Sequence, residues 1–82
     1  MRPRKVVRVE GSVEFEVPFA ILRKGDGFKL FESSGQALNY GDVFKADSDA
    51  YIDNTGVWMV KAVPLLFGNR LSKSCIVSSF DG

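Results

Sequence analysis

The most constraining feature of this sequence is that its apolar residues alternate with polar ones in short runs, which glycine and proline separate. A period of two is the pattern of a strand with one buried face, whereas a helix needs apolar residues three and four positions apart. The runs are rich in Val, Phe and Ile, which favour strands. We therefore expect an all-β protein with, at most, a short helical turn near residues 64–73.

The first two expected strands, residues 5–9 and 13–17, form a hairpin whose register can be set in two ways. A two-residue turn would place Val9 opposite Glu14 and mix apolar and charged side chains on each face. A three-residue loop would place Val9 opposite Val13 and keep one face apolar. Because burial of one face fixes the register of a strand, we expect the three-residue loop.

A second hairpin is expected where residues 50–52 and 57–60 flank an Asp-Asn-Thr-Gly segment. Gly56 in the left-handed conformation would close a three-residue loop. This register sets Ile52 opposite Trp58 and Ala50 opposite Val60, so we expect all four on one apolar face and Trp58 mostly buried.

Further strands are expected at residues 27–33, 42–46 and 74–80. Residues 25–29 and 41–45 share a Gly-Asp-x-Phe-Lys pattern, typical of a turn that enters a strand with Phe inward and Lys outward. Six or seven short strands suit a small barrel, SH3-like or OB-like, or a rolled antiparallel sheet. An open roll that forms a homodimer through a sheet edge is the alternative.

Length and composition fit one small β domain spanning residues 1–82. The longest apolar stretch, 62–67, is far shorter than the ~20 residues that span a bilayer, so we expect no membrane partner and a cytoplasmic location. With one cysteine and no histidine, the chain lacks the ligands of a structural zinc site and the usual general base. We expect no cofactor, no metal site and no catalysis, and we expect Cys75 to be buried.

The charge distribution is uneven: four bases lie within the first eight residues, whereas residues 9–60 carry nine acids and four bases. Residues 1–4 are expected to form a basic, flexible tail that adds little to folding, and Arg8 to pair with Glu14 across the first hairpin. Such a tail can contact phosphate. The candidate nucleic-acid-binding residues are Arg2, Arg4, Lys5 and Arg8.

A family resemblance rests on Phe19, Leu22, the Gly25-Asp26 turn and Phe28, followed by short matches at 44–46, 50–51 and 54–56. Over about residues 19–63 the chain resembles small all-β accessory proteins of bacteriophages and mobile elements, most of which have no assigned function. The resemblance implies a phage origin, a location in the bacterial host cell and a non-enzymatic accessory role. The resemblance assigns a functional role to no residue of this chain.

Three hypotheses about function follow. The first is docking on a host or viral protein, with inhibition of a defence or nucleic-acid-processing complex as one outcome. The second is binding of single-stranded nucleic acid by surface aromatics and the basic N-terminal residues, and the third is a structural role in a virion. The candidate partner-binding residues are Tyr51, Tyr40, Phe31, Asp49 and Asp53.

Overall fold

Strands make up about half of the protein. The structure, a computed structural model, describes residues 2–66, 69–70 and 73–81. The strands are β1 (Arg2–Pro3), β2 (Lys5–Glu10), β3 (Val13–Val17), β4 (Gly27–Phe31), β5 (Phe44–Ala46), β6 (Tyr51–Ile52), β7 (Trp58–Leu66), β8 (Asn69–Arg70), β9 (Cys75–Ser78) and β10 (Phe80–Asp81). The helices among these residues are the short 3-10 segments η1 (Phe19–Ile21) and η2 (Asn39–Gly41). None of the described helices is long and apolar enough to cross a membrane.

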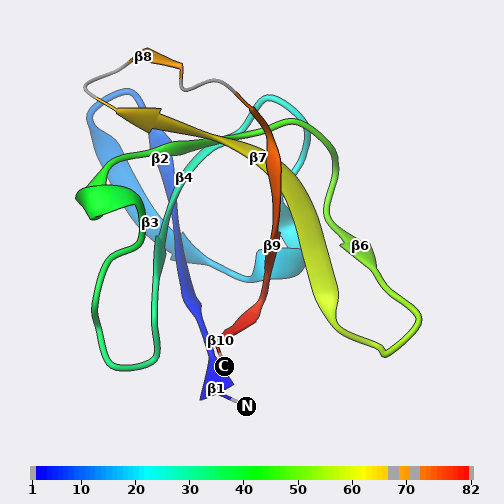
Figure 1. Ribbon diagram of the computed structural model, residues 1–82. Helices are drawn as coiled ribbons and strands as arrows, with labels where there is room; N and C mark the ends of the chain where they lie inside the picture. The colour runs from blue at the N-terminus through cyan, green and yellow to red at the C-terminus, as the bar shows by residue number, and fades with distance from the viewer. Residues whose placement is uncertain (1, 67–68, 71–72, 82) are drawn as a thin grey trace.

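Eight of the strands form one antiparallel sheet in the order β3-β2-β4-β5-β7-β6, with β8 and β9 also pairing with β7. The sheet is rolled, with β2, β3 and β4 on one side and β6, β7 and β9 on the other (Figure 1). Among the described strands, continuous backbone pairing does not close the roll. The separate β1·β10 pair brings the two ends of the chain side by side. The expected all-β class is confirmed.

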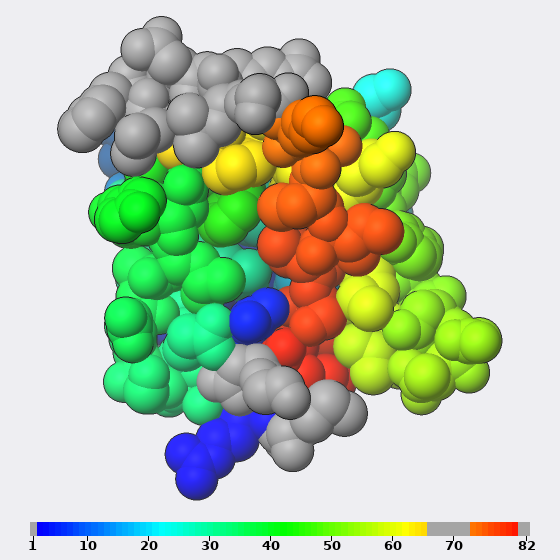
Figure 2. Space-filling view, in the orientation of Figure 1, coloured from blue at the N-terminus to red at the C-terminus, as the bar shows by residue number. Residues whose placement is uncertain are grey.

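The core lies inside the roll, where the two Gly-Asp-x-Phe-Lys segments meet. Phe28 and Phe44 lie opposite each other on β4 and β5, are almost fully buried, and stack with ring centroids 5.5 Å apart. Lys45, the next residue on β5, is exposed. The expected inward Phe is confirmed in both segments and the exposed Lys in the second, whereas Lys29 is half-buried. Side chains fill the opening seen in the ribbon (Figure 2). The cluster comprises Val6, Phe19, Leu22, Phe28, Leu30, Phe44, Ala46, Val60, Ala62 and Val77.

The expected register of the first hairpin is wrong. Val9 lies opposite Glu14 and Glu10 opposite Val13, so the turn has two residues, with Gly11 at a φ of 60°. A positive φ at the first central residue is what a type II′ hairpin turn requires, and glycine adopts it without strain. Burial could not fix the register because β3 is an outer strand whose residues from Val13 to Glu16 are all exposed.

The second hairpin follows the expected register over its two paired positions. Ile52 lies opposite Trp58, and Gly56 has a φ of 86°. Trp58 is partly buried against the core, whereas Ile52 remains 53% exposed. The expected pairing of Ala50 with Val60 does not form, because the Ala50 amide donates instead to the carbonyl of Leu22 at 2.9 Å.

Three expectations about the last third of the chain need correction. No helical turn forms at 64–66 or 69–70, which belong to β7 and β8; residues 67–68 and 71–72 lie outside the described part. The expected closing strand is divided at Ser79, whose amide donates to the carbonyl of Trp58. Cys75 is exposed and not buried as expected, and Ile76, the next residue at the start of β9, is exposed as well.

Candidate functional site

The basic N-terminal residues do not form a free tail. Arg2 and Pro3 pair with β10, and the Arg4 amide donates to the carbonyl of Ser79 at 2.8 Å. The Arg4 side chain, only 17% exposed, bonds Glu32 through Nε at 3.0 Å and Nη2 at 2.9 Å. Its Nη1 donates to the carbonyl of Ser78 at 3.2 Å. The expectation of a flexible tail at residues 1–4 is therefore wrong for residues 2–4.

Two other candidate nucleic-acid-binding residues also have acidic neighbours. Arg8 lies opposite Phe15, not opposite Glu14 as expected, because the hairpin has the two-residue turn. Its Nη2 contacts Glu10 at 3.0 Å and Asp26 at 3.4 Å. Lys5 is more exposed and approaches Glu16 at 3.7 Å. Carboxylates thus offset much of the positive charge that the sequence concentrates at this end.

The two candidate aspartates stabilise turns. The amide of Lys24 donates to Asp49 Oδ1 at 2.9 Å. Asp53 Oδ1 accepts the Thr55 hydroxyl at 2.6 Å and the amides of Thr55 and Val57 at 2.8 and 3.1 Å. These bonds favour the charged form of Asp53 and hold its pKa below the ordinary value. The bond from the Thr55 hydroxyl has the largest effect. Asp53 therefore stabilises its own turn, whereas Asp49 holds the backbone at Lys24, 25 positions away in the sequence.

The three candidate aromatic residues do not form one surface. Tyr51 lies on β6, Phe31 on β4, and Tyr40 in η2, where it is 92% exposed with a φ of 56°. Strands β5 and β7 separate β4 from β6 in the sheet. The structure therefore offers no single site that contains all five candidate partner-binding residues.

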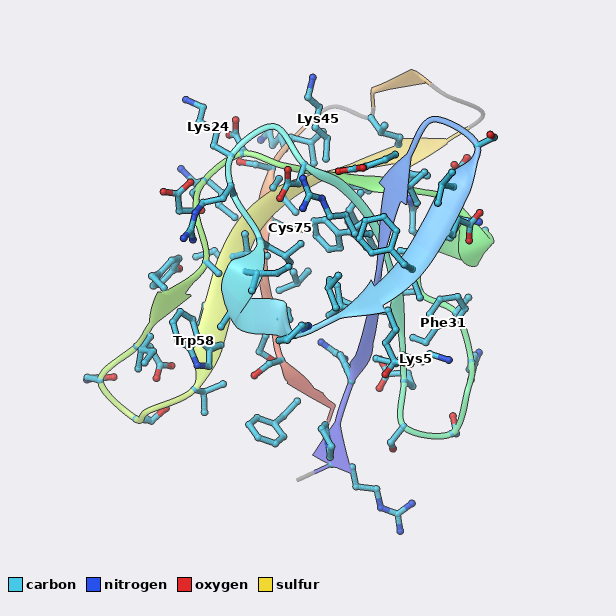
Figure 3. The ribbon with its side chains drawn as sticks, turned by 180° about the vertical axis from the view of Figure 1, so that it is seen from behind. Lys5, Lys24, Phe31, Lys45, Trp58 and Cys75 are labelled. Carbon is cyan, nitrogen blue, oxygen red and sulfur yellow. The ribbon has the colours of Figure 1, made fainter. Side chains whose placement is uncertain are left out.

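A groove of about 650 Å³ does unite residues from two of the candidate sets. Phe31 lies directly opposite Lys5 on the outer face of the sheet, as Figure 3 shows from behind. Arg2 joins them from β1, and the turn after β4 also lines the groove. We call this the Phe31 groove; it is lined by Arg2, Pro3, Lys5, Val7, Phe31, Glu32, Ser33 and Gly35.

A second surface consists of residues that the sequence analysis did not select. Strand β3 pairs with β2 on one side, and no described strand pairs with its other side. Val13 is 58% and Phe15 39% exposed, and both share the face of Val17, which packs against the core. Glu14 and Glu16 lie on the opposite face. We call Val13–Val17 and its free backbone side the β3 edge.

The backbone of the β3 edge follows from its register. The residue pair that closes a two-residue hairpin turn exchanges both of its backbone hydrogen bonds, here Glu10 and Val13. Since bonded and non-bonded pairs alternate, Phe15 also points its backbone groups at β2. The amides and carbonyls of Glu14 and Glu16 then point to the unpaired side. The alternating sequence predicted this strand, but not its place at the outside of the sheet.

Other surface features are smaller. A hollow of about 310 Å³ lies at the far end of the molecule from the Phe31 groove, with Lys24 and Lys45 at its rim (Figure 3). Exposed Ile52 and Ile76 lie on β6 and β9. Among the residues that the structure describes, no group of three or more His, Cys, Asp or Glu side chains is placed to hold a metal ion.

Comparison with known proteins adds no relative: the chain matches no protein-family model, no curated protein and no solved structure. The surfaces above are therefore interpreted from their own chemistry.

Proposed function

We propose that this chain is a non-enzymatic protein-binding module that docks an extended segment of another protein along the β3 edge. The observation that carries the proposal is an outer strand exposed on both faces, with two large apolar side chains on the face that continues into the core. Proteins usually protect such an edge by covering, twisting or shortening it. An accessible edge strand of five residues with one apolar face is instead suited to accept a strand.

The β3 edge offers the two components of strand addition. Free backbone groups at Glu14 and Glu16 provide hydrogen bonds, which give affinity, and Val13 and Phe15 provide apolar contacts for alternate partner residues. An added strand would extend the face that carries Val17 and so lengthen the core. The resemblance at residues 19–63 supports a bacteriophage or mobile-element setting, in which docking would block or redirect a host protein.

The experiment uses a capped peptide of alternating valine and glutamine, added at millimolar concentration to ¹⁵N-labelled protein. We expect the largest amide shifts at Glu14 and Glu16. In the Glu14→Pro variant the shifts should disappear, because proline removes an amide that faces the unpaired side and leaves the bonds to β2 intact. Glu14→Gln is the matched control and should bind like the parent. Equal binding by the proline variant, or no shift along β3, would contradict strand docking.

A second function is favoured by the Phe31 groove, namely binding of single-stranded nucleic acid. An aromatic ring beside two cations in a concave site is the usual arrangement for stacking a base and contacting its phosphates. Against it, Glu16 already lies 3.7 Å from Lys5, and Glu32 in the groove lining adds another carboxylate. The sheet edge therefore remains the preferred site.

Fluorescence anisotropy with labelled oligothymidine at two salt concentrations separates the two functions. Groove binding predicts that Arg2→Gln/Lys5→Gln weakens binding and lowers the salt slope by roughly 0.7 per lost contact. The matched control, Lys24→Gln/Lys45→Gln, removes the same charge at the other end of the molecule and should have little effect. Equal effects of the two double variants would rule out the groove.

A further inference from the structure

We infer that the β3 edge selects a partner segment in which basic and apolar residues alternate, and that it disfavours a second copy of this chain. The inference rests on the proposed docking function and deepens it. It starts from the positions of Glu14 and Glu16, which carry the free backbone groups and share one face of the strand. An antiparallel strand added at this edge places one residue directly opposite each of these glutamates.

The two carboxylates remain available to a partner although each already has one cation nearby. Glu14 Oε2 lies 3.1 Å from Lys29 Nζ, and Glu16 Oε1 lies 3.7 Å from Lys5 Nζ. The side chains of Glu14 and Glu16 are still 47% and 67% exposed. A carboxylate has about four acceptor positions, so a lysine or arginine from the other side can bond to it as well. β3 itself carries no basic residue.

The apolar positions of the partner follow from the same alternation. Val13, Phe15 and Val17 occupy the other face of β3, with Val17 against the core. Partner residues beside them must be apolar to bury these side chains. The complete pattern is therefore apolar-basic-apolar-basic-apolar, in an extended segment of at least five residues.

Self-pairing is opposed by symmetry. An edge-to-edge dimer that continues the sheet has its two-fold axis perpendicular to the sheet, so each face of one copy meets the same face of the other. Full overlap of β3 with its symmetry mate then places Glu14 opposite Glu16 twice. Directly opposite like charges destabilise a sheet. The glutamates thus protect an apolar edge against its own copies, which is a common device at exposed strands.

Three capped peptides test the inference, each alternating valine with lysine, glutamine or glutamate, against ¹⁵N-labelled protein. We expect the lysine peptide to bind about 2- to 30-fold more tightly than the glutamine peptide, from two cross-strand ion pairs. The glutamate peptide should bind least. In Glu14→Lys/Glu16→Lys the order of lysine and glutamate peptides should reverse, and in Glu14→Gln/Glu16→Gln the three affinities should converge.

The outcomes separate the inference from the proposed function. Equal binding of all three peptides at β3 would overturn the charge preference and leave strand docking in place. No shift along β3 with any peptide would overturn both. Sedimentation gives an independent readout: Glu14→Gln/Glu16→Gln should self-associate more than the parent, and a parent that already dimerises through β3 would contradict the inference.

Discussion

Replacing Arg4 with alanine removes the side chain that ties three distant segments together at the junction of β1 and β2. Its guanidinium contacts Glu32, which follows β4, at 2.9 and 3.0 Å, and the carbonyl of Ser78 on β9 at 3.2 Å. The partners lie 28 and 74 positions away in the sequence. The substitution leaves the Glu32 carboxylate, 25% exposed, without this partner.

The expected loss of stability in Arg4→Ala follows from the partial burial of this ion pair. A fully exposed ion pair contributes about 0–1 kcal/mol, whereas breaking a buried pair costs about 3–5 kcal/mol. With exposed fractions of 17% and 25%, the Arg4–Glu32 pair lies between these limits, so we expect a loss of about 2 kcal/mol. In a domain of this size that lowers the melting temperature by roughly 8–16 °C.

Thermal unfolding followed by circular dichroism measures the effect. Arg2→Ala is the matched control, because Arg2 is exposed, and it should change stability by less than about 0.5 kcal/mol. The double variant Arg4→Ala/Glu32→Ala should lose less unfolding free energy than the two single variants together, since both changes remove the same interaction. If Arg4→Ala melts together with Arg2→Ala, the N-terminal residues form a tail after all and our reasoning is refuted.

Three further predictions concern the core, a turn and the cysteine. In chemical denaturation Phe28→Ala should lower the free energy of unfolding by about 3–5 kcal/mol. Trp58→Ala should lower it clearly less, because Trp58 is only partly buried. A larger loss for Trp58→Ala than for Phe28→Ala would contradict this packing. The pKa of Asp53 is lowered on folding, so its contribution is present above the ordinary value of 3.8 and is lost as the pH falls through the folded value. The melting temperatures of Asp53→Asn and the parent should therefore converge in acid, and a constant difference would exclude this linkage. Exposed Cys75 should react fully with a thiol reagent in native buffer, whereas protection until unfolding would mean that it is buried.

The parts of the fold that depend on neighbouring residues could be predicted from the sequence. Gly56 sets its hairpin because the left-handed turn position is a local requirement, and Phe28 and Phe44 point inward because each follows the same Gly-Asp turn. The register of the first hairpin could not be predicted, for a different reason. Whether Val13 is covered depends on which strand becomes the outermost one, and no local pattern reports that.

The candidate site could be predicted only in part. Phe31, Arg2 and Lys5 were each selected from the sequence, but their meeting in one groove depends on the pairing of β2 with β4. The sequence places Arg4 ahead of the first expected strand and so predicts a mobile tail. Its partner Glu32 lies 28 positions away, and no local pattern indicates that contact. Asp53 was selected for its charge, whereas its hydrogen bonds show that it stabilises its own turn.

Hydrogen exchange of the β3 amides tests strand docking most directly. In the free protein, the amides of Val13 and Phe15 should be protected by β2, and those of Glu14 and Glu16 should exchange rapidly. Saturation with the lysine peptide should slow exchange at Glu14 and Glu16 and leave Val13 and Phe15 little changed. If the two glutamate amides are already protected in the free protein, or still exchange rapidly when the peptide is bound, the β3 edge is not the docking site.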